Sequence, residues 1–287
     1  MNALSFVNVS VVYGEGTPFR KVALDNINID FPSGEIIGII GHTGSGKSTL
    51  AMLSNGLLKP TEGKILLYQK DIWEKPKEIS KVRYKVGIAF QYPEYQLFEE
   101  TVYKDIAFGP KNMGLSDEEI ENRVLNAARF CGIDENMLKK SPFELSGGQK
   151  RRAAIAGVVA MDPQILVLDE PAAGLDPRGR EEILGGLISY QRQKGSTMVL
   201  ISHSMEDIAK LCDRILVLKN GSVYMYGTVK DVFMQAERLF GASLDLPQIT
   251  KLFIELKKRN LTENTDVYTV KYAKKEVAKL LGQNTEQ

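Results

Sequence analysis

The sequence predicts an α/β fold built on a mostly parallel sheet. Three short apolar runs, at residues 36–40, 165–168 and 198–201, have the continuous hydrophobic character of strands that are covered on both faces. Segments with helical spacing of their apolar residues separate these runs, as right-handed βαβ crossovers require. Near the N-terminus, two segments alternate apolar and polar residues instead, which predicts a separate antiparallel β subdomain.

The first elements along the chain follow from this patterning. Leu4–Val12 and Val22–Phe31 are the two alternating segments, and we expect them to be half-buried antiparallel strands. A turn leads from them into the buried strand Ile36–Ile40. A Gly-rich loop and a helix over Lys47–Leu57 come next, followed by a short strand over Lys64–Tyr68.

The middle of the chain is predicted to be mainly helical. A short strand at residues 86–90 precedes it, and the helical pattern runs from about Asn112 to Ala160. Ser116 is a plausible N-cap because three acidic residues, at 117–119, follow it in the first helical turn.

The last third returns to alternating strands and helices. Strands are expected at Ile165–Leu168, Met198–Ile201 and Ile215–Leu218, with helical patterns between them. From about Thr228 onward the sequence is helical and rich in lysine and carries no motif, so we interpret it as an appended region.

Composition excludes several classes of protein. The 287 residues carry 37 Lys and Arg against 36 Asp and Glu, a net charge of +1, which argues against binding nucleic acid mainly through counterion release. No apolar run approaches the roughly 18 residues that span a bilayer, and the N-terminus does not resemble a signal peptide. The two cysteines, Cys131 and Cys212, have no paired spacing. We therefore expect a reduced, cytosolic chain with small buried thiols and no zinc site.

Residues 41–48 form the first chemical motif. Their sequence, GHTGSGKS, fits G-x-x-x-x-G-K-[ST] and lies between a buried strand and a helix, the context in which this motif binds phosphate. The glycines let backbone N–H groups turn toward phosphate oxygens at the positive end of the helix. We expect Lys47 to reach the β- and γ-phosphates and the Ser48 hydroxyl to ligate Mg²⁺. The alternative is an ordinary Gly-rich turn, and His42, at a variable position of the motif, receives no catalytic role.

Two carboxylates at the end of a buried strand narrow the chemistry. Asp169 and Glu170 follow the apolar residues 165–168, where charges are costly unless they meet a cation or a proton. Strand alternation predicts that the two side chains point to different sides. We assign Asp169 to Mg²⁺ and Glu170 to the attacking water, as general base or orienting group. The alternative is an acid pair at a helix N-terminus, since Pro171 follows.

A second anion-binding element occurs in Leu145-Ser146-Gly147-Gly148-Gln149, at the start of another helix. A nucleotide needs only one such cradle from the subunit that holds it. The second one therefore suggests a dimer in which each chain contributes to its partner's site. A capped helix start without a ligand is the alternative.

Along the chain these features follow one another as residues 41–48, Gln91, residues 145–149, Asp169-Glu170 and His203. This order resembles the nucleotide-binding domain of ATP-binding cassette (ABC) proteins over roughly residues 3 to 235. The resemblance implies a P-loop NTPase fold, ATP and Mg²⁺ as ligands, and ATP hydrolysis. It implies that Tyr13 stacks on adenine, that Gln91 senses Mg²⁺ and the γ-phosphate, and that His203 contacts the γ-phosphate. Asp176 corresponds to the D-loop at the dimer interface.

Motifs and resemblance together give a complete set of expected site residues. The expected catalytic residues are Glu170, His203 and Gln91. The expected metal ligands are Ser48, Gln91 and Asp169. The expected nucleotide contacts are Tyr13, Gly41, Thr43, Gly44, Ser45, Gly46, Lys47, Ser48, Thr49, Ser146, Gly147, Gly148, Gln149 and Asp176. The resemblance also divides the chain into a nucleotide-binding domain at 1–235, with a helical signature subdomain at about 90–160, and a C-terminal helical extension at 236–287.

Residues 90–112, FQYPEYQLFEETVYKDIAFGPKN, support a narrower resemblance. This long loop mixes aromatic residues with the acids Glu94, Glu99 and Glu100 and resembles the energy-coupling factor (ECF) group of ABC proteins. Thr43 of the phosphate loop and the run DEPAAGLDPRGR resemble the second of that group's two ATPase types. The resemblance implies an ATPase subunit that pairs with a second ATPase, as a homodimer or heterodimer, and powers uptake of vitamins or other micronutrients.

The implied partners are a transmembrane coupling subunit, which docks on the acidic aromatic loop, and a membrane substrate-binding subunit. The implied location is the cytoplasmic face of the cell membrane, as a peripheral protein, and no nucleic acid is expected to bind. Two other functions stay open from the sequence. A conventional ABC transporter ATPase would carry the same motifs, and a soluble ABC protein acting on nucleic acid would usually add a second cassette or a long insertion.

Overall fold

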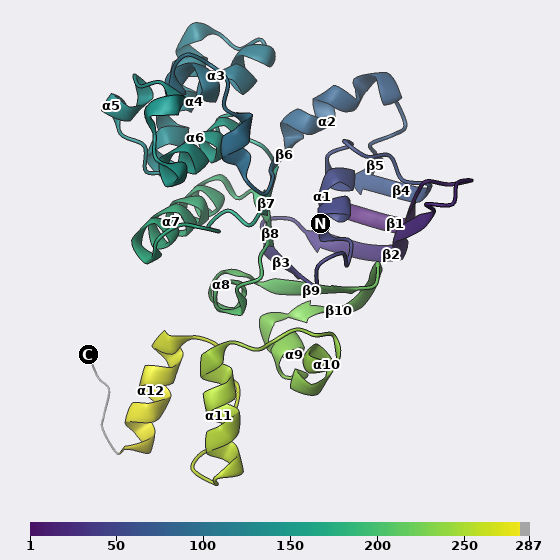
Figure 1. The fold of residues 1–287 in the computed structure, drawn as a ribbon, viewed down its shortest axis with the longest axis vertical. Helices are drawn as coiled ribbons and strands as arrows, with labels where there is room; N and C mark the ends of the chain where they lie inside the picture. Colours follow the sequence, from purple (N-terminus) through teal and green to yellow (C-terminus); the bar gives the residue numbers. More distant parts are fainter. Residues whose placement is uncertain (282–287) are drawn as a thin grey trace.

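A six-stranded sheet forms the centre of the computed structural model, which describes residues 1–281 (Figure 1). Its strand order is β10-β9-β3-β8-β7-β6. The strands are β3 (Ile36–Ile40), β6 (Val86–Ala89), β7 (Ile165–Asp169), β8 (Thr197–Ile201), β9 (Arg214–Lys219) and β10 (Ser222–Thr228). Five of them run parallel, and only β10 pairs antiparallel, with β9.

The two faces of this sheet belong to two hydrophobic clusters, because successive side chains of a strand point to opposite faces. In β7, Leu166 and Leu168 join the cluster that extends into the helical subdomain. Ile165 and Val167 join the cluster shared with the N-terminal sheet. All four side chains are fully buried, which explains why the strand reads as a continuous apolar run.

The N-terminal sheet is antiparallel and has the order β2-β1-β4-β5. Its strands are β1 (Asn2–Tyr13), β2 (Lys21–Pro32), β4 (Glu62–Leu67) and β5 (Lys70–Asp71). The inward face carries residues such as Phe6 and Phe31, whose rings meet edge to face with centroids 5.8 Å apart. Helix α1 (Lys47–Ser54) adds Leu50 and Leu53 to the same cluster.

The helical subdomain lies beyond the β6 edge of the core sheet (Figure 1). Its α-helices are α3 (Val102–Asn112), α4 (Asp117–Phe130), α5 (Glu135–Leu138) and α6 (Gly147–Val159). The 3-10 helix η2 (Pro93–Gln96) precedes α3, and η3 (Pro142–Glu144) lies between α5 and α6. Helix α2 (Ile79–Lys85), preceded by η1 (Pro76–Glu78), leads into β6. Ser116 caps α4 in a capping box with Glu119, as its sequence context predicts.

Six helices follow in the remainder of the described chain: α7 (Pro177–Lys194), α8 (Met205–Leu211), α9 (Val229–Phe233), α10 (Ala236–Gly241), α11 (Gln248–Lys258) and α12 (Val270–Leu280). In Figure 1, α11 and α12 extend away from the two sheets. Among the described residues, no helix combines the length and the apolar character needed to cross a membrane.

The predicted α/β class, the N-terminal antiparallel sheet and the helical subdomain are confirmed. The continuous helical pattern from Asn112 to Ala160 is wrong in detail, because turns divide this stretch and its first helix, α3, already begins at Val102. The sequence reading also missed β10, which closes a tight hairpin at Asn220-Gly221.

The domain boundary after residue 235 stays a prediction. Buried Leu239, Leu244 and Leu246 lie beyond it and still belong to the cluster that contains the core sheet. Phe253, Val267 and Ala273, by contrast, form a small cluster of their own. The hydrophobic packing of the core therefore continues past 235, and Ile254 and Tyr268, next to the small cluster, also pack against the core.

Candidate functional site: a nucleotide cavity

The loop between β3 and α1 is held in shape by its glycines. Gly46 precedes the helix at a φ of 106°, in the left-handed region, and a Cβ there would lie 2.5 Å from a methyl carbon of Leu24 and 2.8 Å from the carbonyl oxygen of Ala23. Only glycine fits this conformation and this close approach. Gly41 and Ser45 are buried beneath the loop, while Thr43 and Gly44 lie exposed on its outside.

Lys47 folds back over the same loop. Its ammonium Nζ donates hydrogen bonds to the carbonyl oxygens of Gly41, at 2.7 Å, and His42, at 3.1 Å. Burial lowers the pKa of Lys47, and the nearby carboxylates of Asp169 and Glu170 oppose that shift. The ammonium thus lies against the loop's own carbonyl groups, with the carboxylates of Asp169 and Glu170 close enough to affect its pKa.

Asp169 ends β7 opposite the first turn of α1. The Ser48 hydroxyl donates to Asp169 Oδ2 at 3.1 Å, which brings together the hydroxyl and the carboxylate that were assigned to Mg²⁺. Burial raises the pKa of Asp169, against the effect of the Ser48 hydrogen bond and of Lys47. A cation between these two oxygen groups would favour the ionised carboxylate, and such oxygen ligands suit Mg²⁺.

Glu170 leaves the strand rather than continuing it. Its φ is 52°, an uncommon conformation for a residue other than glycine, and its backbone N–H still donates to the Ile201 carbonyl oxygen. The expectation that strand alternation separates the two carboxylates is therefore wrong. The chain turns at Glu170, and both acidic side chains line one cavity.

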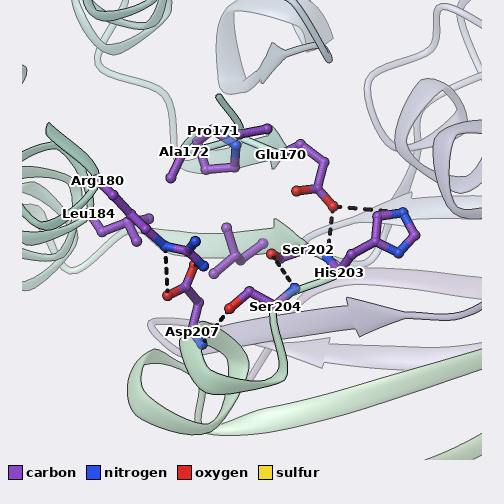
Figure 2. Close-up of a pocket in the computed structure, with 11 residues that line it drawn as sticks. Glu170, Pro171, Ala172, Arg180, Leu184, Ser202, His203, Ser204 and Asp207 are labelled. Atoms are coloured by element: carbon purple, nitrogen blue, oxygen red, sulfur yellow. Dashed lines mark hydrogen bonds and ion pairs between the residues drawn. The ribbon is translucent and has the colours of Figure 1, made fainter. Parts of the chain in front are cut away.

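Glu170 and His203 meet at this turn (Figure 2). Glu170 Oε1 accepts a hydrogen bond from the His203 backbone N–H at 2.7 Å and lies 3.8 Å from the imidazole Nε2. Burial raises the pKa of Glu170. A carboxyl group with a raised pKa, fixed by a backbone donor, is suited to accept a proton from water.

A cavity of about 290 Å³ gathers most of the predicted residues. Predicted residues that line it are Tyr13, Thr43, Gly44, Gly46, Lys47, Ser48, Thr49, Gln91, Asp169, Glu170 and His203. They come from β1, from the loop and helix after β3, from the loop after β6, and from the ends of β7 and β8. The carboxyl ends of parallel strands therefore converge on one site, as open α/β sheets require.

Sequence reasoning missed two residues of this cavity, Lys21 and Ala23, both on β2. Lys21 pairs with Tyr13 across the antiparallel β1–β2 ladder. The signal that could have found it is the strand register, because residues opposite Tyr13 must share its end of the sheet.

The signature segment lies elsewhere. Ser146 caps α6 by accepting from the Gln149 backbone N–H, while the Gln149 side chain accepts from the Ser146 N–H. Neither they nor Gly147 and Gly148 are among the residues that line the cavity. Asp176 caps α7 through a 2.6 Å hydrogen bond from the Gly179 N–H and is also outside the cavity.

A second hollow, of about 210 Å³, is also lined by Glu170 and His203 (Figure 2). There the Arg180 guanidinium of α7 pairs with the Asp207 carboxylate of α8. Ser204 caps α8 by accepting from the Asp207 backbone N–H. This pair ties the helix after Asp176 to the helix after His203.

Comparison with known proteins decides the family. A family model described as "ABC transporter" matches residues 24–173, more than half of the chain. The chain belongs to the ABC transporter family. It is 53% identical, over 96% of both sequences, to the energy-coupling factor transporter ATP-binding protein EcfA2 of Caldanaerobacter subterraneus subsp. tengcongensis.

Solved structures agree with this assignment. The structure of cbiO1 from Clostridium perfringens, described as part of the ABC transporter complex cbiONQ, aligns with a TM-score of 0.74 at 42% identity, covering 88% of this chain and 98% of that one. A dimeric post-hydrolysis structure of the ATP-binding cassette MJ0796, bound to ADP and Pi, aligns with a TM-score of 0.71 at 30% identity, covering 79% and 98%. The chain is thus an ABC ATPase of the energy-coupling factor type, and the predicted family, ATP binding and ATP hydrolysis are confirmed.

Proposed function

We propose that this chain hydrolyses ATP in a site shared with a second ATPase subunit, as a homodimer or heterodimer, and so powers uptake of a vitamin or other micronutrient through a membrane complex. The observation that carries the shared site is the separation within one chain. The phosphate loop and both carboxylates line one cavity, whereas the exposed residues Ser146 and Gly147 begin a helix outside it. A second subunit can bring its own signature helix to complete the cavity.

The residues of the cavity divide the chemistry among them. Tyr13, 38% exposed at the end of β1, offers a face on which an adenine ring can stack. Lys47 and the N–H groups at the start of α1 hold the phosphates. Glu170 accepts the proton of the attacking water, and the His203 ring, beside it, faces the terminal phosphate.

Mg²⁺ fits the donor set at the junction of α1 and β7. The Ser48 hydroxyl and the Asp169 carboxylate lie 3.1 Å apart, and Gln91 lines the same cavity. Mg²⁺ usually takes one or two protein oxygen ligands together with phosphate oxygens and water, so few protein ligands are needed. When bound, Mg²⁺ would neutralise charge that develops on the phosphates.

An exposed surface near Gln91 suits the transmembrane coupling subunit. We name Tyr92, Tyr95, Phe98 and Phe108 the aromatic face; their exposed fractions are 51%, 85%, 59% and 43%. The rings associate in pairs, with centroids 6.2 Å apart for Tyr92 and Tyr95 and 5.0 Å apart for Phe98 and Phe108. So many exposed rings in one segment are unusual unless a partner covers them.

Of the three acids expected to join this docking surface, only Glu99 and Glu100 remain candidates. Glu94 is largely buried by an ion pair with Arg151. Docking of the coupling subunit here would place this chain at the cytoplasmic face of the membrane as a peripheral subunit. The substrate-binding membrane subunit would then contact the coupling subunit.

The shared site is tested by substituting the signature in the subunit complex purified from detergent-solubilised membranes. Gly148→Asp should abolish ATP turnover by placing a carboxylate against the partner's γ-phosphate, while ATP binding to the isolated chain persists. Gly185→Asp, at an exposed helical glycine with open space around it, controls for the added charge and should leave turnover unchanged. At Gly148 a Cβ would lie 2.9 Å from a methyl carbon of Leu175, so the end of that side chain must also shift. Loss of ATP binding by the isolated Gly148→Asp chain would contradict a shared site.

The transport role is tested by identifying the membrane proteins that co-purify with the tagged chain. The proposal predicts a coupling subunit together with separate substrate-binding membrane proteins, and vitamin or micronutrient uptake that Glu170→Gln stops. A conventional ABC transporter would instead yield one set of transmembrane subunits with no exchangeable substrate-binding membrane protein. Turnover stimulated by DNA or RNA would point to a nucleic-acid function.

A further inference from the structure

A buried ion pair joins the loop after Gln91 to the signature helix α6. The Arg151 guanidinium donates from Nε to Glu94 Oε2 and from Nη2 to Glu94 Oε1, both at 3.1 Å. This is the bidentate arrangement in which arginine and carboxylate match each other's geometry. The Arg151 side chain is only 4% exposed and that of Glu94 17%, so the pair is shielded from solvent.

A second contact holds the residue between Gln91 and Pro93. The Arg151 guanidinium lies over the ring of Tyr92, 5.6 Å from its centroid, in cation–π geometry. Tyr92 has a φ of 59° and a ψ of 53°, a left-handed conformation that a bulky residue adopts only when its surroundings impose it. Arg151 therefore contacts both Tyr92 and Glu94, which lie one and three positions after Gln91.

Arg151 belongs to the same helix, α6, as the signature segment. Ser146 caps the helix and Arg151 lies in its second turn, so the helix carries both as one rigid element. At the other end of the contact, Gln91 lines the nucleotide cavity. One guanidinium thus connects a residue at this chain's own nucleotide with the segment that completes the partner's site.

We propose that the Glu94–Arg151 pair is a positioning link that makes the signature segment of α6 move with Gln91. Through it, the nucleotide in this chain's cavity sets the position at which Ser146 and Gly148 meet the nucleotide of the partner. The inference rests on the proposed shared site. In this role the buried ion pair fixes one arrangement of the two segments rather than adding stability.

The same geometry removes Glu94 from the docking surface. Both of its carboxylate oxygens accept from Arg151, whereas Glu100, 81% exposed, pairs with neighbouring Lys104 on the surface. A docking charge needs a carboxylate that a partner can reach from solvent, as it can reach Glu100 but not the largely buried Glu94. Glu94 and Glu100 therefore act differently although they lie six positions apart.

The test is a double-mutant cycle on kcat for ATP in the purified ATPase pair, both without and with the membrane subunits. Glu94→Gln keeps the shape of the side chain and removes its charge, and Arg151→Lys keeps the charge and removes the fork. Each should lower kcat at least tenfold, while the ATP Kd of the isolated chain changes less than twofold. The double variant should be no slower than the slower single variant, because both changes break one link. Glu118→Gln, at an exposed acid in the first turn of α4 in the same helical subdomain, is the control and should leave kcat unchanged.

Three results would overturn the link. These are a kcat within twofold of wild type in both single variants, single effects that multiply in the double variant, and a loss that appears only with the membrane subunits, which would mark a docking charge. Thermal unfolding of each variant shows whether a lower kcat comes from a less stable chain. In that case kcat should recover when the assay is cooled, and such a recovery would also overturn the link. Gly148→Asp, measured in parallel, separates the two proposals. If the Gly148→Asp variant keeps its ATP turnover, the shared site itself is contradicted. If Gly148→Asp loses turnover while Glu94→Gln turns over ATP like the wild type, only the link is contradicted.

Discussion

Glu170→Gln is the substitution that most specifically removes the proposed chemistry. The amide has the shape of the carboxyl group, and its oxygen can still accept the 2.7 Å hydrogen bond from the His203 N–H. The left-handed backbone at position 170 is unaffected by a change at the end of the side chain. What disappears is the ability to take a proton from water, because an amide is not a base at neutral pH.

The size of the effect follows from that single loss. A positioned general base typically contributes about 10²- to 10⁴-fold to a rate. Since each tenfold change corresponds to about 1.4 kcal/mol, the barrier should rise by about 3 to 5 kcal/mol. Binding of ATP should change little, because the phosphate loop and Tyr13 stay intact. ATP should therefore persist in the site and hold the ATPase pair closed.

Steady-state phosphate release by the purified complex measures the rate, and calorimetry on the isolated chain measures ATP affinity. Glu181→Gln is the matched control, since Glu181 lies on α7 with its side chain 80% exposed and has only a 3.8 Å ion pair with Lys210. A second ATPase subunit of different sequence would retain its own site, so the corresponding substitution belongs in both subunits. Turnover within threefold of wild type would remove Glu170 from the mechanism.

Three further predictions concern other parts of the chain. Lys47→Ala should weaken ATP binding at least tenfold by calorimetry, because a charge-assisted contact is typically worth about 1.5–3 kcal/mol; an unchanged affinity would mean that Lys47 does not face the phosphates. Cys131 should resist iodoacetamide at pH 8 in the folded chain and react after unfolding, because burial raises the pKa of its thiol to about 12; rapid modification of the native protein would refute this burial. Phe253→Ala removes a fully buried ring from the separate C-terminal cluster, at a cost of about 3–5 kcal/mol. Limited proteolysis should then cut the region after residue 246 while ATP affinity stays normal, and equal protection of both proteins would argue against a separate cluster.

The strands and the phosphate site were predictable because they depend on local signals. A parallel strand buried on both faces leaves a run such as residues 165–168, and a loop that must admit phosphate leaves glycines at fixed spacing. Ser48 and Asp169 were assigned to one cation from their motifs, whereas the role of His203 came from the resemblance to ABC proteins. The structure brings all three to one cavity, because the carboxyl ends of parallel strands share one edge of a sheet.

Features that depend on tertiary contacts escaped the sequence. The turn at Glu170 overrode strand alternation, because its φ is positive where the next residue of a strand would be extended. Lys21 joined the cavity only through the register of β1 and β2. The composition of the loop after Gln91 made Glu94 resemble its acidic neighbours, and only the distant Arg151 distinguishes it.

The central claim is that ATP is held between this chain's phosphate loop and the signature segment of a second subunit. Light scattering on the Glu170→Gln chain with its ATPase partner, with and without ATP and Mg²⁺, measures this most directly. The account predicts the combined mass of the two subunits, near twice 31.9 kDa for a homodimer, only when ATP is present. It predicts separate subunits when Gly148→Asp is added to Glu170→Gln, with the corresponding substitutions in a partner of different sequence. An ATP-dependent dimer that still forms with Gly148→Asp would contradict the claim. A mass that is the same with and without ATP would contradict it as well.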